Sequence, residues 1–192
     1  MKKFKYLLLV FVVLFSMNTQ AQNETKIDDA KLNDFIKKLC LSGLAFRTSD
    51  SRQAGQDIEE LILNFLGLTK EDPNYKEKLT KFWNENNHKF ICHEEGTTKF
   101  TRTPQHFLKR IVDLGMHKSV LGDFLLSNPY KYPINVNTVE IYNGKEETLL
   151  DYLDAIISNP DNKEKYNIPE IKSLRRLLLM GYNAKTASEL KK

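Results

Sequence analysis

Apolar residues recur at helical spacing along much of the chain. In residues 27–45 and 51–66 they fall at i, i+3, i+4, i+7 and i+8, so that each segment has one apolar face. These positions are Leu32, Phe35, Ile36, Leu39 and Cys40 in the first segment, and Ile58, Leu61, Ile62, Phe65 and Leu66 in the second. No strand pattern of useful length appears. The sequence therefore predicts an all-α fold.

Further helices are predicted downstream by the same periodicity. One carries Tyr75, Leu79, Phe82 and Trp83 on one side, and others cover residues 103–114, the region of Val120 to Leu125, residues 149–157 and residues 169–180. Gly67, Gly115 and Gly181 follow three of these segments and are expected to end them. Between 127 and 147 the chain is predicted to be extended, because Pro129 and Pro133 exclude a helix and Asn143-Gly144 marks a tight turn.

The first 21 residues have the pattern of a secretory signal peptide. Lys2, Lys3 and Lys5 precede an apolar run, and small residues end at Ala21. The run is too short to span a bilayer comfortably. We expect cleavage after Ala21, a periplasmic or secreted location, and no membrane anchor in the mature chain. An uncleaved anchor is the alternative.

The charge balance changes once this segment is removed. The whole chain carries 29 basic and 25 acidic residues, and three of the basic ones are the lysines of the leader. The mature chain is therefore close to neutral, and no basic patch favours nucleic acid as a partner. The chain has two cysteines, Cys40 and Cys92. An even number in an oxidising compartment suggests a disulfide between them, with two buried free thiols as the alternative.

The second half of the chain resembles the ankyrin repeat, in which units of two short helices are joined through a turn. Several short motifs carry this resemblance: Thr103-Pro104 with His106, Asn135-Val136-Asn137, Asn143-Gly144, Thr148-Leu149, Glu170-Ile171, Leu177 to Leu179, Gly181 and Ala184. The first unit has a longer first helix than the family, and the second carries an insertion. The resemblance implies stacked antiparallel helix pairs and a protein partner that contacts the turns and first helices.

These observations predict a domain organisation. Residues 1–21 form the signal peptide, residues 22–95 form an N-terminal helical region, and residues 96–192 form an ankyrin-like helical repeat region. The N-terminal region is expected to act as a helical cap, because a repeat array needs a cover for its exposed end.

Candidate chemistry is sparse. His88 and Cys92 have the i, i+4 spacing that can chelate zinc, but a structural site needs four ligands and fails if Cys92 is in a disulfide. A small periplasmic hydrolase using His88, His93, Glu94 and Glu95 is the enzymatic alternative. Asp151 and Asp154 share part of a helix face, and we interpret them as structural rather than as an acid/base pair. His106 is interpreted as the repeat's structural histidine. We expect no cofactor and no enzyme activity.

Aromatic and charged residues gather near the predicted turn. Tyrosine supplies a large, rigid contact area with a polar tip, so it is favoured in binding surfaces. The candidate contact residues are Tyr130, Lys131, Tyr132, Tyr142, Lys145 and Glu146, and the alternative is that these tyrosines pack an irregular loop. The resulting prediction is an exported protein-binding module of the cell envelope. One version is an immunity-type inhibitor of an envelope-targeted toxin.

Overall fold

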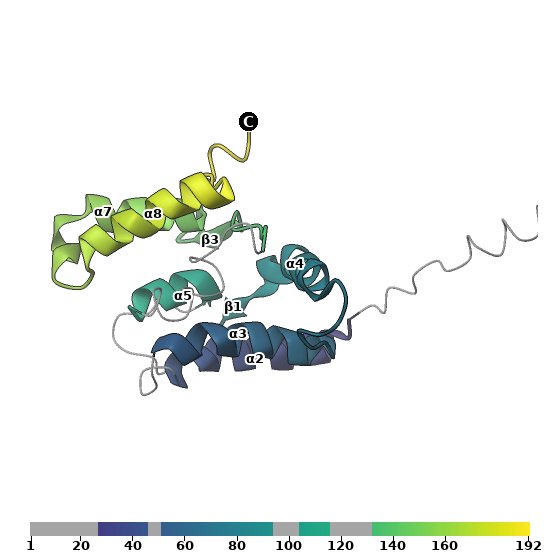
Figure 1. Cartoon of the computed structure of the whole chain (residues 1–192). Coiled ribbons are helices and arrows are strands. Elements are labelled where there is room, and N and C mark those ends of the chain that lie inside the picture. Colours follow the sequence, from purple (N-terminus) through teal and green to yellow (C-terminus); the bar gives the residue numbers. More distant parts are fainter. Residues whose placement is uncertain (1–26, 46–50, 94–103, 116–131) are drawn as a thin grey trace, which may run out of the picture. The chain divides into compact units, whose positions relative to one another are not determined.

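A computed structural model of the chain describes residues 27–45, 51–93, 104–115 and 132–192 (Figure 1). The chain forms two compact units, residues 1–32 and residues 33–192, and each is considered by itself. Of the first unit, residues 27–32 are described. There the Asp28 carboxylate accepts the backbone N–H of Ala30 at 2.9 Å, at the start of helix α2 (Asp29–Ala45). The predicted signal peptide lies outside the described residues.

Most helices follow the predicted periodicity, but the helix predicted over residues 103–114 covers only Phe107–Asp113, because Gln105 and His106 form a strand. After α2 come α3 (Ser51–Leu66), α4 (Tyr75–Asn86), α5 (Phe107–Asp113), α7 (Leu149–Ser158) and α8 (Ile168–Tyr182), with short 3₁₀ helices η2 (Asn87–Lys89) and η4 (Pro160–Lys163). Gly67 and Gly115 adopt φ values of +65° and +67° just beyond α3 and α5, as expected of glycines that end helices. The helix predicted around Val120 to Leu125 lies outside the described residues.

The prediction of an all-α fold is wrong. The described residues contain two antiparallel sheets of two strands each. In one, β1 (Ile91–Cys92) pairs with β2 (Gln105–His106), and in the other, β3 (Glu140–Tyr142) pairs with β4 (Lys145–Glu147). Strands of two or three residues are too short to show an alternating pattern, so hydrophobic periodicity cannot reveal them. The predicted boundary between residues 95 and 96 lies outside the described residues, and β1 and β2 pair across it.

Aromatic rings from several elements form a core within residues 33–192. Phe35 of α2 lies 4.7 Å from Phe65, 5.4 Å from Phe82 and 5.7 Å from Phe90 between ring centroids. Trp83 meets Phe90 edge to face at 5.3 Å. Such pairs add about 0.5–1.5 kcal/mol each beyond the apolar area that they bury. The core therefore joins α2, α3, α4 and the residue before β1.

The predicted disulfide between Cys40 and Cys92 is confirmed, with an S–S distance of 2.01 Å. It connects α2 to β1, and both cysteines are buried. In a chain-entropy model, a loop between cysteines 52 residues apart gains about 4 kcal/mol from the cross-link. A buried disulfide is typical of an oxidising compartment. Across the described residues, we find no helix with the length and apolar character required to cross a membrane.

Helices α7 and α8 lie side by side, joined by η4 (Figure 1). Each has a buried apolar face, formed by Leu149, Leu150, Tyr152, Leu153 and Ile156 in α7 and by Ile171, Leu174, Leu178 and Tyr182 in α8. The prediction that α8 ends at Gly181 is wrong. The helix continues to Tyr182, and Asn183 is its left-handed cap at φ 49°. Asparagine tolerates this conformation because its short polar side chain bonds locally.

Candidate functional site

The β3–β4 hairpin carries three of the six candidate contact residues, and all three are exposed. Its two-residue turn consists of Asn143 and Gly144, with φ values of 51° and 73°. Positive φ at both turn positions matches the twist of the flanking strands, which is why Asn-Gly favours tight hairpins. The turn places Tyr142 opposite Lys145 and leaves both near the tip.

A buried lysine holds the base of the hairpin. Glu140 and Glu147 face each other across the two strands, where like charges repel. Lys109 of α5 forms ion pairs with both carboxylates, with its Nζ 3.0 Å from Glu147 Oε1, and donates to the Glu147 carbonyl at 3.2 Å. The side chains of Lys109, Glu140 and Glu147 are 2%, 14% and 15% exposed. The cluster therefore fixes the hairpin to α5 with charges that are largely removed from water.

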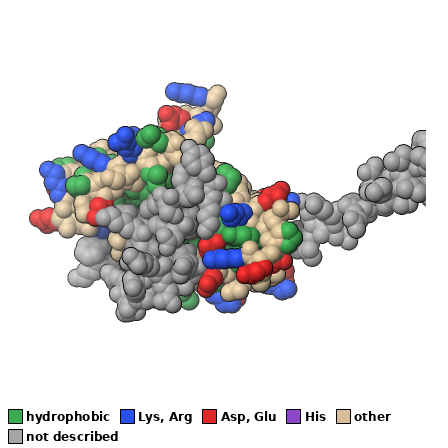
Figure 2. All heavy atoms as spheres, viewed as in Figure 1, with side chains coloured by type: hydrophobic (Ala, Val, Ile, Leu, Met, Phe, Trp, Pro, Cys, Tyr) green, Lys and Arg blue, Asp and Glu red, His purple; other side chains and the backbone are tan. Residues whose placement is uncertain are grey.

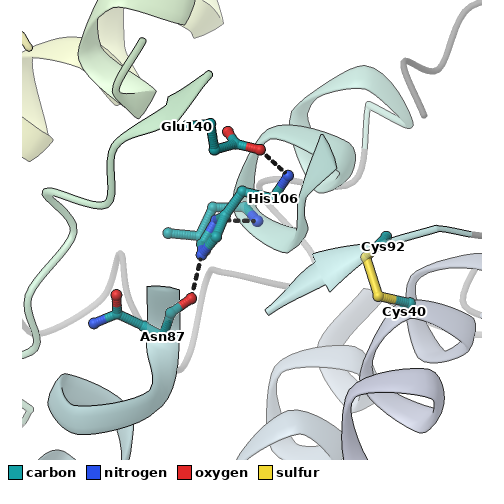
Figure 3. Close-up of a disulfide and its surroundings, with 6 residues drawn as sticks. Cys40, Asn87, Cys92, His106 and Glu140 are labelled. Carbon is teal, nitrogen blue, oxygen red and sulfur yellow. Dashed lines mark hydrogen bonds between the residues drawn. A yellow bond between two sulfur atoms is a disulfide. The ribbon is translucent and has the colours of Figure 1, made fainter. Parts of the chain in front are cut away.

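The backbone of His106 also contacts this cluster, through Glu140 (Figure 3). Its N–H donates to the Glu140 carboxylate. Its ring Nδ1 accepts the N–H of Leu108 at 3.2 Å and caps α5, so the proton lies on Nε2, which donates to the Asn87 carbonyl at 2.8 Å. Burial lowers the pKa of His106 to about 4, although Glu140 acts in the opposite direction. The ring is thus a neutral, fully engaged structural group, while the repeat to which the sequence assigns it stays a prediction.

The extended segment that leads into β3 is fixed through its backbone. The Asn135 carbonyl accepts hydrogen bonds from Trp83 Nε1 at 3.1 Å and Asn87 Nδ2 at 3.2 Å. The Asn135 N–H donates to Asn84 Oδ1 at 2.6 Å. Thr138 then donates its hydroxyl proton to Asn87 Oδ1. Side chains of α4 and η2 therefore hold this strand-like segment just before the hairpin begins.

The candidate contact residues separate into three groups. Tyr130 and Lys131 lie outside the described residues. Tyr132 is 0% exposed and donates its hydroxyl proton to Glu59, so its placement is that of a core residue and not of a surface contact. The remaining three, Tyr142, Lys145 and Glu146, lie together on the hairpin and are exposed, Tyr142 by 36%.

Sequence reasoning missed the most exposed apolar residue of the hairpin. Ile141 is 77% exposed, more than any other large hydrophobic side chain among the described residues. The Asn143-Gly144 turn was the signal that could have found it, because this dipeptide favours a hairpin and flanking residues then alternate between its two faces.

Only two of the four residues of the hydrolase alternative lie within the described structure. His88 and His93 are exposed, and Glu94 and Glu95 lie outside the described residues. A hollow of about 390 Å³ includes His93, Cys40 and two lysines, and no described carboxylate lines it. Cys92 is in the disulfide, so the His88 and Cys92 pair cannot ligate zinc. Within the described ranges, no three His, Cys, Asp or Glu side chains are placed to hold a metal ion.

Asp151 and Asp154 have structural partners. The Asp151 carboxylate accepts the N–H groups of Thr148 at 2.9 Å and Ala187 at 2.8 Å, and Thr148 accepts the Asp151 N–H in return. This is a capping box at the start of α7. Asp154 forms an ion pair with Arg175 of α8. These contacts agree with the interpretation of Asp151 and Asp154 as structural residues.

Comparisons with known proteins identify no relative of the chain. Scans against protein-family models, curated proteins and solved structures each returned no match to the chain. Nothing in the described helices identifies ankyrin repeats, so that resemblance stays a prediction from the short motifs.

Proposed function

We propose that this protein is an exported protein-binding module whose contact surface is the β3–β4 hairpin. The observation that carries the proposal is Ile141, a large apolar side chain that is 77% exposed on β3, the strand that also carries Tyr142. Burial of an exposed isoleucine on a partner recovers about 1.5–3 kcal/mol of hydrophobic free energy. Tyrosine is among the residues most enriched at the energetic centres of interfaces.

The anchoring of the hairpin supports this role. A segment that is already ordered before binding loses less conformational entropy when it meets a partner. Lys109 fixes both strands, and the Asn135 backbone fixes the segment before them. The ankyrin-like motifs also favour this surface, because partners of that family contact the turns.

Export and the identity of the partner belong to the same proposal. The leader-like first 21 residues and the Cys40–Cys92 disulfide together support a periplasmic or secreted location. A chain that binds a protein there and performs no chemistry suits an immunity-type inhibitor of an envelope-targeted toxin. This is the narrowest version of the proposal, and it requires the partner itself to be identified.

An affinity capture tests the contact surface. Residues 22–192 would be immobilised and exposed to envelope and secreted extracts of the source cells, with bound proteins identified by mass spectrometry. A second bait carries Ile141→Asp and Tyr142→Ala. The control bait carries Leu41→Ser, which alters a 49% exposed apolar residue on α2.

One stoichiometric partner on the wild-type and control baits, absent from the hairpin variant, is the expected result. A partner retained equally by all three baits would place the contact surface elsewhere. Capture of no partner at low and moderate salt would contradict the binding role, and the purified chain would then be assayed for hydrolase activity.

A further inference from the structure

A groove between α7 and α8 combines apolar and cationic side chains. It is an open hollow of about 500 Å³, lined by Asp154 and Ile157 of α7 and by Lys172, Arg175, Arg176, Leu179 and Met180 of α8. This volume lies within the range of pockets that hold ligands. Figure 2 shows Lys and Arg side chains gathered with hydrophobic ones over the α7–α8 region.

The lining residues of α8 form a second stripe on that helix. Positions 172, 175, 176, 179 and 180 follow the i, i+3, i+4, i+7 and i+8 spacing of a single helix face. The other stripe, formed by Ile171, Leu174, Leu178 and Tyr182, is buried in the protein. On the groove side, Met180 is 75% exposed and Leu179 is 37% exposed. Helix α8 therefore has a core face and a separate apolar surface at its C-terminal end.

The groove is lined by more cationic than anionic side chains. Asp154 forms an ion pair with Arg175, and the two also share a hydrogen bond of 3.3 Å between Nη2 and Oδ2. Lys172 and Arg176 are exposed, and neither has an ion-pair partner among the residues that the structure describes. Two cations on one rim therefore remain to receive anionic groups, while Ile157, Leu179 and Met180 provide the apolar surface.

We propose that this α7–α8 groove binds a short acidic peptide segment of another protein. One large apolar side chain of the peptide packs between Ile157, Leu179 and Met180, and neighbouring carboxylates pair with Lys172 and Arg176. Arginine suits this role because its planar guanidinium recognises carboxylates with two parallel hydrogen bonds. Methionine suits it because its flexible, polarisable side chain adapts to the shape of its partner.

The shape of the surface favours a peptide over a lipid bilayer. The groove is concave, so a peptide side chain enters it, whereas a flat headgroup layer meets only its rim. An acidic peptide with one large apolar residue can interact with both the cationic and the apolar side chains that line the groove.

An unbiased peptide selection tests the inference. A phage library of random peptides is selected on immobilised residues 22–192. The selected sequences are then synthesised with a fluorescein label and titrated against variants by fluorescence anisotropy. The variants are Lys172→Glu with Arg176→Glu, and Met180→Ser. The charge-reversal control is Lys76→Glu with Lys78→Glu on α4, and Ile141→Asp is the hairpin control.

The expected peptides carry Asp or Glu next to a large apolar residue. We expect the double charge reversal to weaken their binding by more than about tenfold, a loss of about 1.4 kcal/mol, and both controls to bind as the wild type does. Met180→Ser should weaken binding as well, and added salt should reduce the affinity of the wild type. Retention of the wild-type circular dichroism spectrum by each variant separates loss of binding from loss of fold.

Several results would overturn the proposal. One is a selection that yields no peptides with an acidic residue next to a large apolar one. Another is that the selected peptides bind the groove variants as tightly as the wild type. Loss of binding only with Ile141→Asp would assign the peptides to the hairpin and leave the proposed function standing without the groove. Sedimentation with phosphatidylglycerol vesicles, lost in the groove variants and accompanied by no peptide binding, would assign the groove to a membrane surface instead.

Discussion

The phenol of Tyr152 donates a hydrogen bond to the carboxylate of Asp113, which joins α7 to the end of α5. The Asp113 side chain is 0% exposed, and it also accepts hydrogen bonds from Tyr166 and from Gln105 Nε2, the latter at 3.0 Å. Burial raises the pKa of Tyr152, and the charge of Asp113 adds to this effect, so the phenol remains a donor. A buried carboxylate needs such donors because it has lost its hydration.

Removal of the phenol should therefore destabilise the fold. Tyr152→Phe keeps the ring and loses one hydrogen bond to a charged group, which is worth about 1.5–3 kcal/mol. Asp113→Ala should cost more, because it leaves the buried Tyr152 and Gln105 donors without their acceptor. Urea denaturation measures both changes. The exposed Asp161→Asn variant is the control and should lie within about 0.5 kcal/mol of the wild type. An unchanged urea midpoint for Tyr152→Phe would mean that the hydrogen bond contributes nothing.

The Lys109 cluster predicts a large effect with a specific rescue. Lys109→Met leaves Glu140 and Glu147 facing each other in a buried site, and loss of one partner of such a cluster costs about 3–5 kcal/mol. Changing both carboxylates to Gln in the Lys109→Met background removes the repulsion and should recover much of this free energy of unfolding. Thermal denaturation is compared for Lys109→Met, for Glu140→Gln with Glu147→Gln, and for the triple variant. The difference gives the coupling free energy between Lys109 and the two carboxylates.

A triple variant that is no more stable than Lys109→Met would contradict the role of Lys109 in joining both strands of the hairpin to α5. The exposed ion pair between Lys81 and Glu85 on α4 offers a matched comparison. Its removal should cost well under about 1 kcal/mol, because solvent screens exposed charges.

His106 predicts a pH dependence of stability. Its pKa is about 4 in the folded protein and near the ordinary value of 6.5 in the unfolded chain. The unfolded state therefore binds a proton more readily between these values. The stabilisation is complete above pH 6.5 and is lost as the pH falls toward about 4, which amounts to about 3 kcal/mol.

The measurement is the free energy of unfolding as a function of pH for the wild type and for His106→Gln. The variant should show a shallower decline over this window. His88→Gln alters an exposed histidine and should reproduce the wild-type profile. Parallel profiles for the wild type and His106→Gln would contradict the assignment of a neutral, buried imidazole.

Gly181 lies within α8 and is exposed, and its φ is not among the positive values of the described residues. Gly181→Ala should therefore stabilise the protein by about 0.5–1 kcal/mol, because alanine loses less backbone entropy in a helix. The same substitution at Gly144, where φ is 73°, should be destabilising. Melting temperatures of the two variants should move in opposite directions, and a fall for Gly181→Ala would indicate that the helix ends earlier.

Helices such as α3, α7 and α8 were predictable because each has a buried apolar stripe. The stripe that includes Ile58 and Ile62 was recognised from spacing alone, and both residues are 0% exposed. The disulfide was predictable from the cysteine count together with the leader-like pattern of the first 21 residues. The β3–β4 hairpin was only partly predictable. Its Asn-Gly turn was recognised, but its three-residue strands carry charged residues rather than an alternating apolar pattern.

The Lys109 cluster could not be predicted. Lysine in a short amphipathic helix is ordinarily expected at the surface. In α5 every residue from Phe107 to Val112 is buried, including Lys109 and Arg110. The partners of Lys109 lie in a hairpin more than thirty residues away, with the pairing set by tertiary packing. The groove likewise depends on how α7 and α8 meet, although the spacing of its α8 residues is visible in the sequence.

The capping of α7 has a consequence for the order in which the chain folds. The Ala187 N–H donates to Asp151 at 2.8 Å, and the Lys185 carbonyl accepts the Thr148 hydroxyl proton at 2.8 Å. The first turn of α7 is therefore completed by residues that lie more than thirty positions further along the chain. During synthesis, the capping of α7 is complete only once residues 185–187 have been made. The Cys40–Cys92 bridge needs only residues that emerge much earlier, so it can close while the α7–α8 region is still incomplete.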